Sequence, residues 1–168
     1  MVDVVCLECA LAFRNEMMDI VVADGNDTIV FPHVDSCVAV VFLHAGGKAT
    51  GGHVSLTAAS GGFGEALSLT EMLGRMLDWT PDPVQQVIFI GHHDWRGVCD
   101  TVIASQPKLA AVPYANVCRF NDPLDIFVEL GSQKLRVQNW QKDTARHETV
   151  APARSGHWIY DENLPTGS

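Results

Sequence analysis

Cys37 and His53 are residue types that together support nucleophilic catalysis, and both lie in the segment "DSCVAVVFLHAGGKATGGHVSL", residues 35–56. A thiol becomes an effective nucleophile when a neighbouring base such as an imidazole accepts its proton. The two residues are 53 − 37 = 16 positions apart, with an apolar run and two glycine pairs between them. A hairpin that folds this segment back on itself would bring a nucleophile and its base together.

The register of that hairpin decides whether the two side chains meet. A turn centred on Ala45 places Cys37 directly opposite His53, with Cβ atoms about 4.5–5.5 Å apart. A turn centred within Gly46–Gly47 places His53 opposite Val40 instead, and the three-residue offset then amounts to roughly 10 Å along the strand. Catalysis by this pair therefore requires the first register, or a bulge that restores it.

Both residues also fit a structural role. Cysteine is among the most frequently buried residue types, and a cysteine in the apolar run "SCVAVVFL" is typical of a core strand. A histidine such as His53 is commonly a hydrogen-bonded structural residue. Spacing by itself leaves the catalytic and the structural interpretations open.

The order of apolar patterns predicts an α/β or α+β layered domain, with a mixed sheet or sandwich core and two flanking helices. Strands are expected at 2–13, 19–23, 28–31, 37–43, 50–58 and 84–91, a helix at 64–78, and a hairpin at 124–130 and 134–140. A second helix is expected after Asp94, which would serve as its N-cap, and Pro107 would end it.

One catalytic domain is expected over residues 1–140, with the motif core at 28–60, because lengths of about 100–200 residues are typical of single domains. From Gln141 onward the apolar residues no longer follow a helix or strand spacing. Residues 141–168 are therefore expected to form a C-terminal tail that caps the site, binds a partner or is partly disordered.

Composition excludes several classes of protein. The net charge of −9 argues against a nucleic-acid binder, because phosphate contacts need clustered Lys and Arg. No apolar run reaches the roughly eighteen residues of a membrane span, and no signal-peptide pattern opens the chain. Five cysteines, an odd number, indicate reduced thiols and a cytosolic, reducing compartment. That compartment need not belong to the cell that makes the protein.

Other residues that could bind a metal have simpler interpretations. Cys6 and Cys9 match C-x-x-C, but no second pair follows at zinc spacing, so two thiols of an apolar strand are favoured. His92 and His93 follow a predicted buried strand, where loops of a site are common, and are interpreted as substrate-rim residues. No metal and no cofactor are required.

Cys99 and Cys118 are the remaining cysteines. The sequence offers no convincing partner for either of them, and both are interpreted as core thiols.

The segments Ser36–Val40 and Gly51–His53 resemble the active-site segment of the CheD chemoreceptor glutamine deamidases, whose Cys–His core also occurs in cytotoxic necrotizing factors and related lethal-factor toxins. The resemblance extends over about residues 28–140 in the order of elements. It implies that Cys37 is the nucleophile and His53 the base.

Two positions depart from the family pattern. A threonine that orients the histidine in CheD-like members is replaced by Phe31, so the resemblance points to the backbone carbonyl of Phe31 or a neighbour, with Thr28 as another candidate. The glycine before Ser36 is replaced by Asp35, whose carboxylate would raise the thiol pKa or contribute to the substrate rim.

The resemblance implies a protein-glutamine deamidase acting through a thioester. His53 would take the proton of Cys37, and backbone N–H groups at Ser36 and Cys37 would stabilise the oxyanion. The expected partner is a protein substrate, either GTPase-like or chemoreceptor-like. The protein would be a chemotaxis modifier or, more in keeping with its divergent flanks, a bacterial effector or toxin that enters a host cell by a signal-peptide-independent route.

Three alternatives stay open at this point. The chain could be a non-catalytic binding module of the same fold, a transglutaminase, in which an amine replaces water, or a cysteine peptidase. Neither the oligomeric state nor the substrate protein follows from the sequence.

Overall fold

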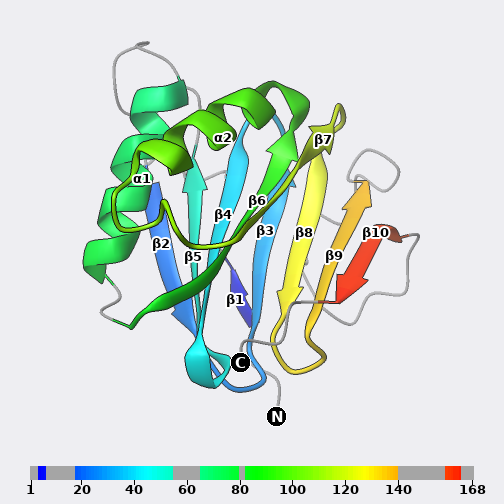
Figure 1. Ribbon diagram of the computed structural model, residues 1–168. Coiled ribbons are helices and arrows are strands. Elements are labelled where there is room, and N and C mark those ends of the chain that lie inside the picture. Colours follow the sequence, from blue (N-terminus) through cyan, green and yellow to red (C-terminus); the bar gives the residue numbers. More distant parts are fainter. Residues whose placement is uncertain (1–3, 7–17, 55–64, 80–81, 140–157, 164–168) are drawn as a thin grey trace.

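A computed structural model describes residues 4–6, 18–54, 65–79, 82–139 and 158–163. Within these ranges the strands form two five-stranded sheets (Figure 1). The first sheet has the order β1 (Val4–Cys6), β3 (Thr28–Val34), β8 (Leu124–Glu129), β9 (Lys134–Asn139) and β10 (Trp158–Asn163). The second has the order β2 (Met18–Ala23), β5 (Ala49–Val54), β4 (Val38–His44), β6 (Val84–His92) and β7 (Tyr114–Phe120).

Two α-helices, α1 (Glu65–Trp79) and α2 (Arg96–Ser105), lie over one face of the second sheet (Figure 1). Buried α1 residues recur at Leu69, Met72, Leu73 and Met76, the spacing of one helical face. They share a core cluster with residues of β4 and β6. Neither of the described helices is long and apolar enough to cross a membrane.

Strand β4 is buried at every position because both of its faces are covered. Its side chains alternate between two clusters. Val38, Val40 and Phe42 pack under the helices. Ala39, Val41 and Leu43 instead face the first sheet. Two-sided burial explains why this segment is an unbroken apolar run rather than an alternating one.

The predicted α+β layered architecture is confirmed, and both sheets are mixed. β1 pairs in parallel with β3, and β6 with β7, whereas the other pairs are antiparallel. The predicted hairpin of β8 and β9 is present. Parallel β6 and β7 are joined through α2, as a crossover connection requires.

Three details differ from the sequence analysis. β7 was not predicted, because its exposed edge carries polar residues that obscure the strand pattern. Asp94 does not cap α2: it lies in a 3₁₀ turn, His93–Trp95, and Trp95 holds the cap position without a side-chain bond. Part of the expected tail, Trp158–Asn163, pairs with β9 as β10. Cys9 and the expected strand residues 55–58 lie outside the described ranges.

Candidate active site

The segment that carries Cys37 lies at an edge where several strands begin or end. Val38, the first residue of β4, pairs with Val54 at the end of β5 and with Gly91 near the end of β6. The end of β3 pairs with the start of β8 at Val34 and Leu124. Residues 35–37 therefore lie beside the end of β5, which carries His53, and beside the turn after β6, at the upper edge in Figure 1.

The β4–β5 hairpin has a register that was not expected. His53 pairs with Ala39, which is neither of the two registers considered from the sequence, so His53 does not lie directly opposite Cys37. The reason is the turn Ala45–Gly47, which centres on Gly46 rather than on Ala45. Gly46 has φ +78° and the next residue φ +77°, values that favour glycine.

Cys37 and His53 nevertheless share a face of the second sheet. Alternate positions of a strand point to the same side, so Cys37 lies on the side of Ala39, the partner of His53. Cys37 belongs to the core cluster between the sheets and is 4% exposed. The two residues are diagonal neighbours, for which Cα atoms lie about 7–8 Å apart and Cβ atoms somewhat closer. This separation lies within reach of an imidazole that rotates toward the thiol.

His53 is buried, and the described part of the chain offers its imidazole no hydrogen bond. The residue is 5% exposed, and neither ring nitrogen has a hydrogen-bond partner among the described residues. The Phe31 ring lies edge-on to the imidazole, with centroids 6.2 Å apart. An unsatisfied buried polar group costs about 1–3 kcal/mol, so the fold retains His53 at the expense of stability.

His44 provides the contrast within the same hairpin. It is 4% exposed, yet its Nε2 lies 2.8 Å from Thr50 Oγ1 and its Nδ1 lies 3.1 Å from the Pro83 carbonyl oxygen. Since a carbonyl only accepts, Nδ1 carries the proton. His44 is thus a satisfied structural histidine, and His53 is not.

The predicted orienting bond to His53 is not observed. The carbonyl of Phe31 is not a partner of either His53 nitrogen, and it is the Phe31 side chain that contacts the imidazole. Thr28 begins β3, at the end of the strand away from Cys37. The reason is that β3 belongs to the first sheet and packs across the core from His53, rather than pairing with its strand.

Three groups hold the backbone of the Cys37 segment. The indole Nε1 of Trp95 donates to the Ser36 carbonyl at 3.1 Å, and the His92 amide donates to the Cys37 carbonyl at 3.4 Å. Gly91 packs so closely that a Cβ there would lie 2.5 Å from the Cys37 carbonyl oxygen. The turn after β6 therefore fixes the position of the Cys37 segment.

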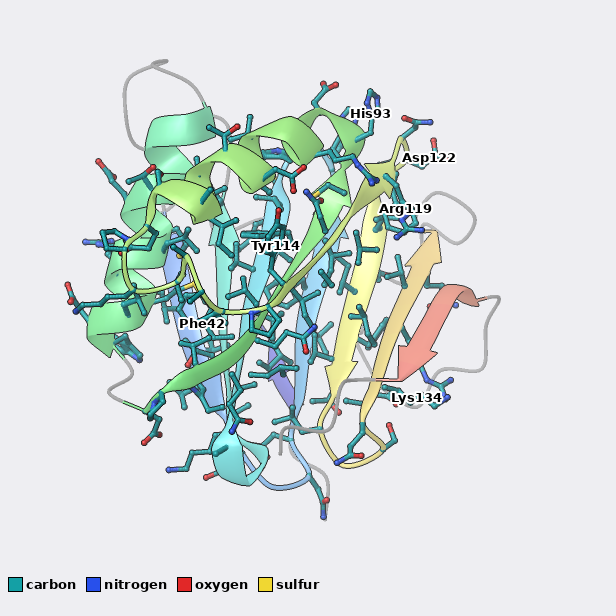
Figure 2. All side chains as sticks on the ribbon, in the orientation of Figure 1. Phe42, His93, Tyr114, Arg119, Asp122 and Lys134 are labelled. Carbon is teal, nitrogen blue, oxygen red and sulfur yellow. The ribbon has the colours of Figure 1, made fainter. Side chains whose placement is uncertain are left out.

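The predicted rim residues lie around this segment. Asp35 and Ser36 are exposed beside Cys37, His92 is partly exposed and His93 is exposed. Figure 2 shows His93 at the upper edge of the molecule, where Arg119 of β7 and Asp122 of the β7–β8 connection are also labelled, and His92 pairs with Phe120 at the end of β7.

Sequence reasoning did not assign Gly91 and Trp95 to the site. A glycine at the end of an apolar strand does signal a close backbone approach, and this signal was present in "VIFIGHHDW". It does not reveal which backbone approaches.

The prediction that Cys99 and Cys118 have no partner is wrong, because they contact each other. Their Sγ atoms are 3.9 Å apart, and both residues are fully buried between α2 and β7. The hydrogen bond between the two thiols, together with burial, raises the pKa of Cys99. These thiols are core groups, as expected, and they belong to the helix-covered side of the second sheet rather than to the site.

Neither a scan against protein-family models nor a search of curated proteins finds a match for this chain. The fold and the site together define a layered α+β domain with a buried thiol and an unsatisfied imidazole on one sheet face. Such a pair is suited to nucleophilic attack on an acyl carbon.

Proposed function

We propose that the protein is a protein-glutamine deamidase in which Cys37 is the nucleophile and His53 the general base. The observation that carries the proposal is the buried His53 imidazole, whose two nitrogens lack hydrogen bonds on the sheet face that also holds Cys37. Retaining such a group is unfavourable for folding, which is typical of residues kept for function. The likeness of Ser36–Val40 and Gly51–His53 to the CheD segment supports the choice of reaction.

The reaction would proceed in two acyl-transfer steps. His53 takes the Cys37 proton, the thiolate sulfur attacks the carboxamide carbon of a glutamine, and the C–N bond breaks as His53 returns the proton to the departing ammonia. Water, deprotonated by the same imidazole, then attacks the thioester carbon. The C–S bond breaks, glutamate forms and the thiol is regenerated.

The surrounding residues have supporting roles in this proposal. The backbone N–H groups at Ser36 and Cys37 stabilise the oxyanion, and the turn after β6 keeps their segment in place. Asp35, His92 and His93 form the rim that a folded protein substrate contacts. Substrate binding would also draw the imidazole to the thiol, since catalytic hydrogen bonds are often long in free enzymes.

The proposed partner is a folded protein, either a GTPase-like or a chemoreceptor-like one, and the proposed setting is the reducing cytosol of a host or producing cell. The proposed reaction uses only a thiol, an imidazole and water, so an effector or toxin of this kind needs no cofactor. The acidic surface that the net charge of −9 implies favours a target with a basic face around its glutamine.

The test is intact-protein and peptide mass spectrometry of candidate small GTPases and chemoreceptor fragments incubated with the protein. Deamidation adds about 1 Da at one glutamine, and this gain should disappear with Cys37→Ser and with His53→Gln. His44→Gln is the matched control, because it also removes a buried histidine of the same hairpin but leaves the Cys37 face intact.

The alternatives give different products. A transglutaminase would attach an added primary amine to the same glutamine, and a peptidase would cleave the substrate chain. If no substrate changes mass and Cys37 also fails to react with iodoacetamide at neutral pH, the deamidase proposal is wrong and the fold serves as a binding module.

A further inference from the structure

A second group of chemically active side chains lies beside the Cys37 segment, in the turn after β6. The carboxylate of Asp94 lies close to two histidines. Its Oδ2 is 3.4 Å from His92 Nδ1, and its Oδ1 is 3.2 Å from His93 Nδ1. One ligand atom from each of the three residues lies within 4.8 Å of the others. The proposed deamidation uses these histidines only as a rim, and the cluster has a chemistry of its own.

The spacing of these atoms fits a small four-coordinate cation. In a tetrahedral zinc site with bonds of about 2.0–2.1 Å, neighbouring ligand atoms are about 3.3–3.4 Å apart. The observed 3.4 and 3.2 Å separations are each close to that edge length, but they run to different oxygens of Asp94, so the carboxylate must rotate to place one oxygen on an ion shared by both rings. The two rings are also already gathered, with centroids 4.3 Å apart. Little rearrangement would therefore be needed to bind an ion.

The hydrogen bonding of His92 also favours a cation. Its Nδ1 accepts a hydrogen bond of 3.2 Å from the Asp94 amide, so this nitrogen carries a lone pair and not a proton. The carboxylate oxygen 3.4 Å away is likewise an acceptor. In this tautomer of a neutral His92, the Nδ1 lone pair lies beside the carboxylate, and a metal ion that binds both groups would displace the Asp94 amide.

The cluster is connected to the nucleophile segment through the backbone. His92 donates its amide to the Cys37 carbonyl, and Trp95, the next residue after the cluster, donates its indole N–H to the Ser36 carbonyl. An ion bound by His92, His93 and Asp94 would restrain His92, which makes the first of these contacts, and Asp94, which precedes Trp95 in the chain. It would restrain the Cys37 segment in its buried position, where the thiol is 4% exposed.

We propose that His92, His93 and Asp94 bind one divalent transition-metal ion of the zinc class, and that this ion slows the reaction of Cys37. Two imidazoles with one carboxylate favour zinc-like cations over Ca²⁺ or Mg²⁺, which prefer oxygen ligands. Three protein ligands leave a fourth position for water. The site is partly exposed, with side-chain exposures of 20%, 53% and 67%, so that the ion has direct access.

The first experiment measures binding by itself. Co²⁺ is titrated into the Cys37→Ser protein, which excludes the catalytic thiol as a ligand, and binding is followed by the intense visible absorption of four-coordinate cobalt. Replacing a residue that hydrogen-bonds to a metal ligand lowers metal affinity by about 10- to 100-fold, and replacing a ligand itself should lower the cobalt affinity by more than that. Such a loss is expected in His93→Gln and in Asp94→Asn. Asp78→Asn on α1 is the matched control for charge and should bind as the parent does.

The second experiment measures the coupling to Cys37. Zn²⁺ should slow iodoacetamide alkylation of Cys37 in the otherwise unaltered protein, and Asp94→Asn should remove that effect. Equal cobalt affinity in the Cys37→Ser parent and in its His93→Gln, Asp94→Asn and Asp78→Asn variants would overturn the proposed site. Equal slowing by zinc in the Asp94→Asn protein would show that the ion binds Cys37 directly and would overturn the coupling. Neither measurement requires deamidation, so failure of the proposed function leaves both tests intact.

Discussion

The two buried histidines of the β4–β5 hairpin, His44 and His53, differ in whether their ring nitrogens are hydrogen-bonded. His44 satisfies both ring nitrogens and supports the fold near the turn. His53 satisfies neither among the described residues, and the phenyl ring of Phe31 lies edge-on to its imidazole. A structural role explains the first histidine but not the second. This difference gives the catalytic interpretation of His53 its physical basis.

Replacing His53 by Leu should therefore stabilise the protein while abolishing the reactivity of Cys37. The substitution removes two unsatisfied buried nitrogens at similar volume, which is expected to raise the free energy of unfolding by about 1 kcal/mol. Urea denaturation measures the stability, and alkylation of Cys37 measures the reactivity.

His44→Leu is the control for that prediction. It removes a histidine whose two ring nitrogens are both hydrogen-bonded, and it should lower the free energy of unfolding by about 1–3 kcal/mol without affecting Cys37. A His53→Leu protein as unstable as the His44→Leu protein would contradict the unsatisfied state of His53.

Cys99 makes the stability depend on alkaline pH. Its pKa is raised in the fold, by the bond to Cys118 first and by burial second, above the ordinary thiol value of 9.0. The native state therefore keeps the thiol protonated while the unfolded chain ionises. The stabilisation is complete below pH 9.0 and is lost as pH rises above it, by up to about 1.4 kcal/mol per pH unit.

Urea denaturation at about pH 8 and about pH 10 tests this prediction, since the two conditions bracket the ordinary thiol pKa. Cys99→Ala lacks the group and should lose less stability between the two conditions than the parent does. An equal loss in both proteins would assign the pH dependence to other residues.

At the scale of elements, the close contact of β6 with the start of β4 positions the Cys37 segment. Gly91 pairs with Val38, and a methyl group on Gly91 would meet the Cys37 carbonyl oxygen at 2.5 Å and the Val38 Cα at 3.0 Å. Both obstacles are backbone atoms, which cannot swing aside as a flexible side chain can. The distance between the two strands is therefore set by this glycine.

Gly91→Ala should displace the Cys37 segment, reduce alkylation of Cys37 and the proposed deamidation by about tenfold or more, and destabilise the fold by about 1–3 kcal/mol. Gly97→Ala is the matched control: nothing lies within 4 Å of a Cβ at Gly97, and alanine favours its helix, α2. The Gly97→Ala protein should match or exceed the parent in stability. Full Cys37 reactivity in the Gly91→Ala protein would show that this contact does not position Cys37.

At the scale of the whole molecule, the first sheet supports the site from across the core and is completed by a distant segment. Trp158–Asn163 forms β10 and pairs along β9 from Gln138 to Lys134. Without β10, the N–H and C=O groups of β9 would form an open edge, which is prone to association. The upper edge with Cys37 and His53 belongs mainly to the other sheet.

Deleting residues 158–168 should lower the thermal midpoint by about 5–10 °C, from a loss of about 2–3 kcal/mol, and should promote association. Alkylation of Cys37 below the unfolding temperature should be unchanged, because the deletion leaves β4, β5 and β6 intact. Differential scanning calorimetry and size-exclusion chromatography measure the first two effects. A large change in Cys37 reactivity would mean that the first sheet controls the site more directly.

Local pattern by itself determined much of this protein. Apolar periodicity predicted β4, β6, α1 and the β8–β9 hairpin, because each buries its own regular stripe or run. It also indicated Cys37 and His53 as the residues to pair. Such signals reside in neighbouring residues and need no knowledge of what the element packs against.

Only the tertiary structure decided the hairpin register, the pairing of β10, the contact between Cys99 and Cys118 and the burial of His53, since these features depend on contacts between distant segments. Two adjacent glycines permit several turn centres at small cost, so the His53–Ala39 register follows from packing of the whole sheet. Strand β10 is defined by its pairing with β9, and the thiols of Cys99 and Cys118 meet only because α2 packs on β7. The burial of His53 without a partner, on which the proposed function depends, is likewise a property of the packed core and not of the residues around it in the chain.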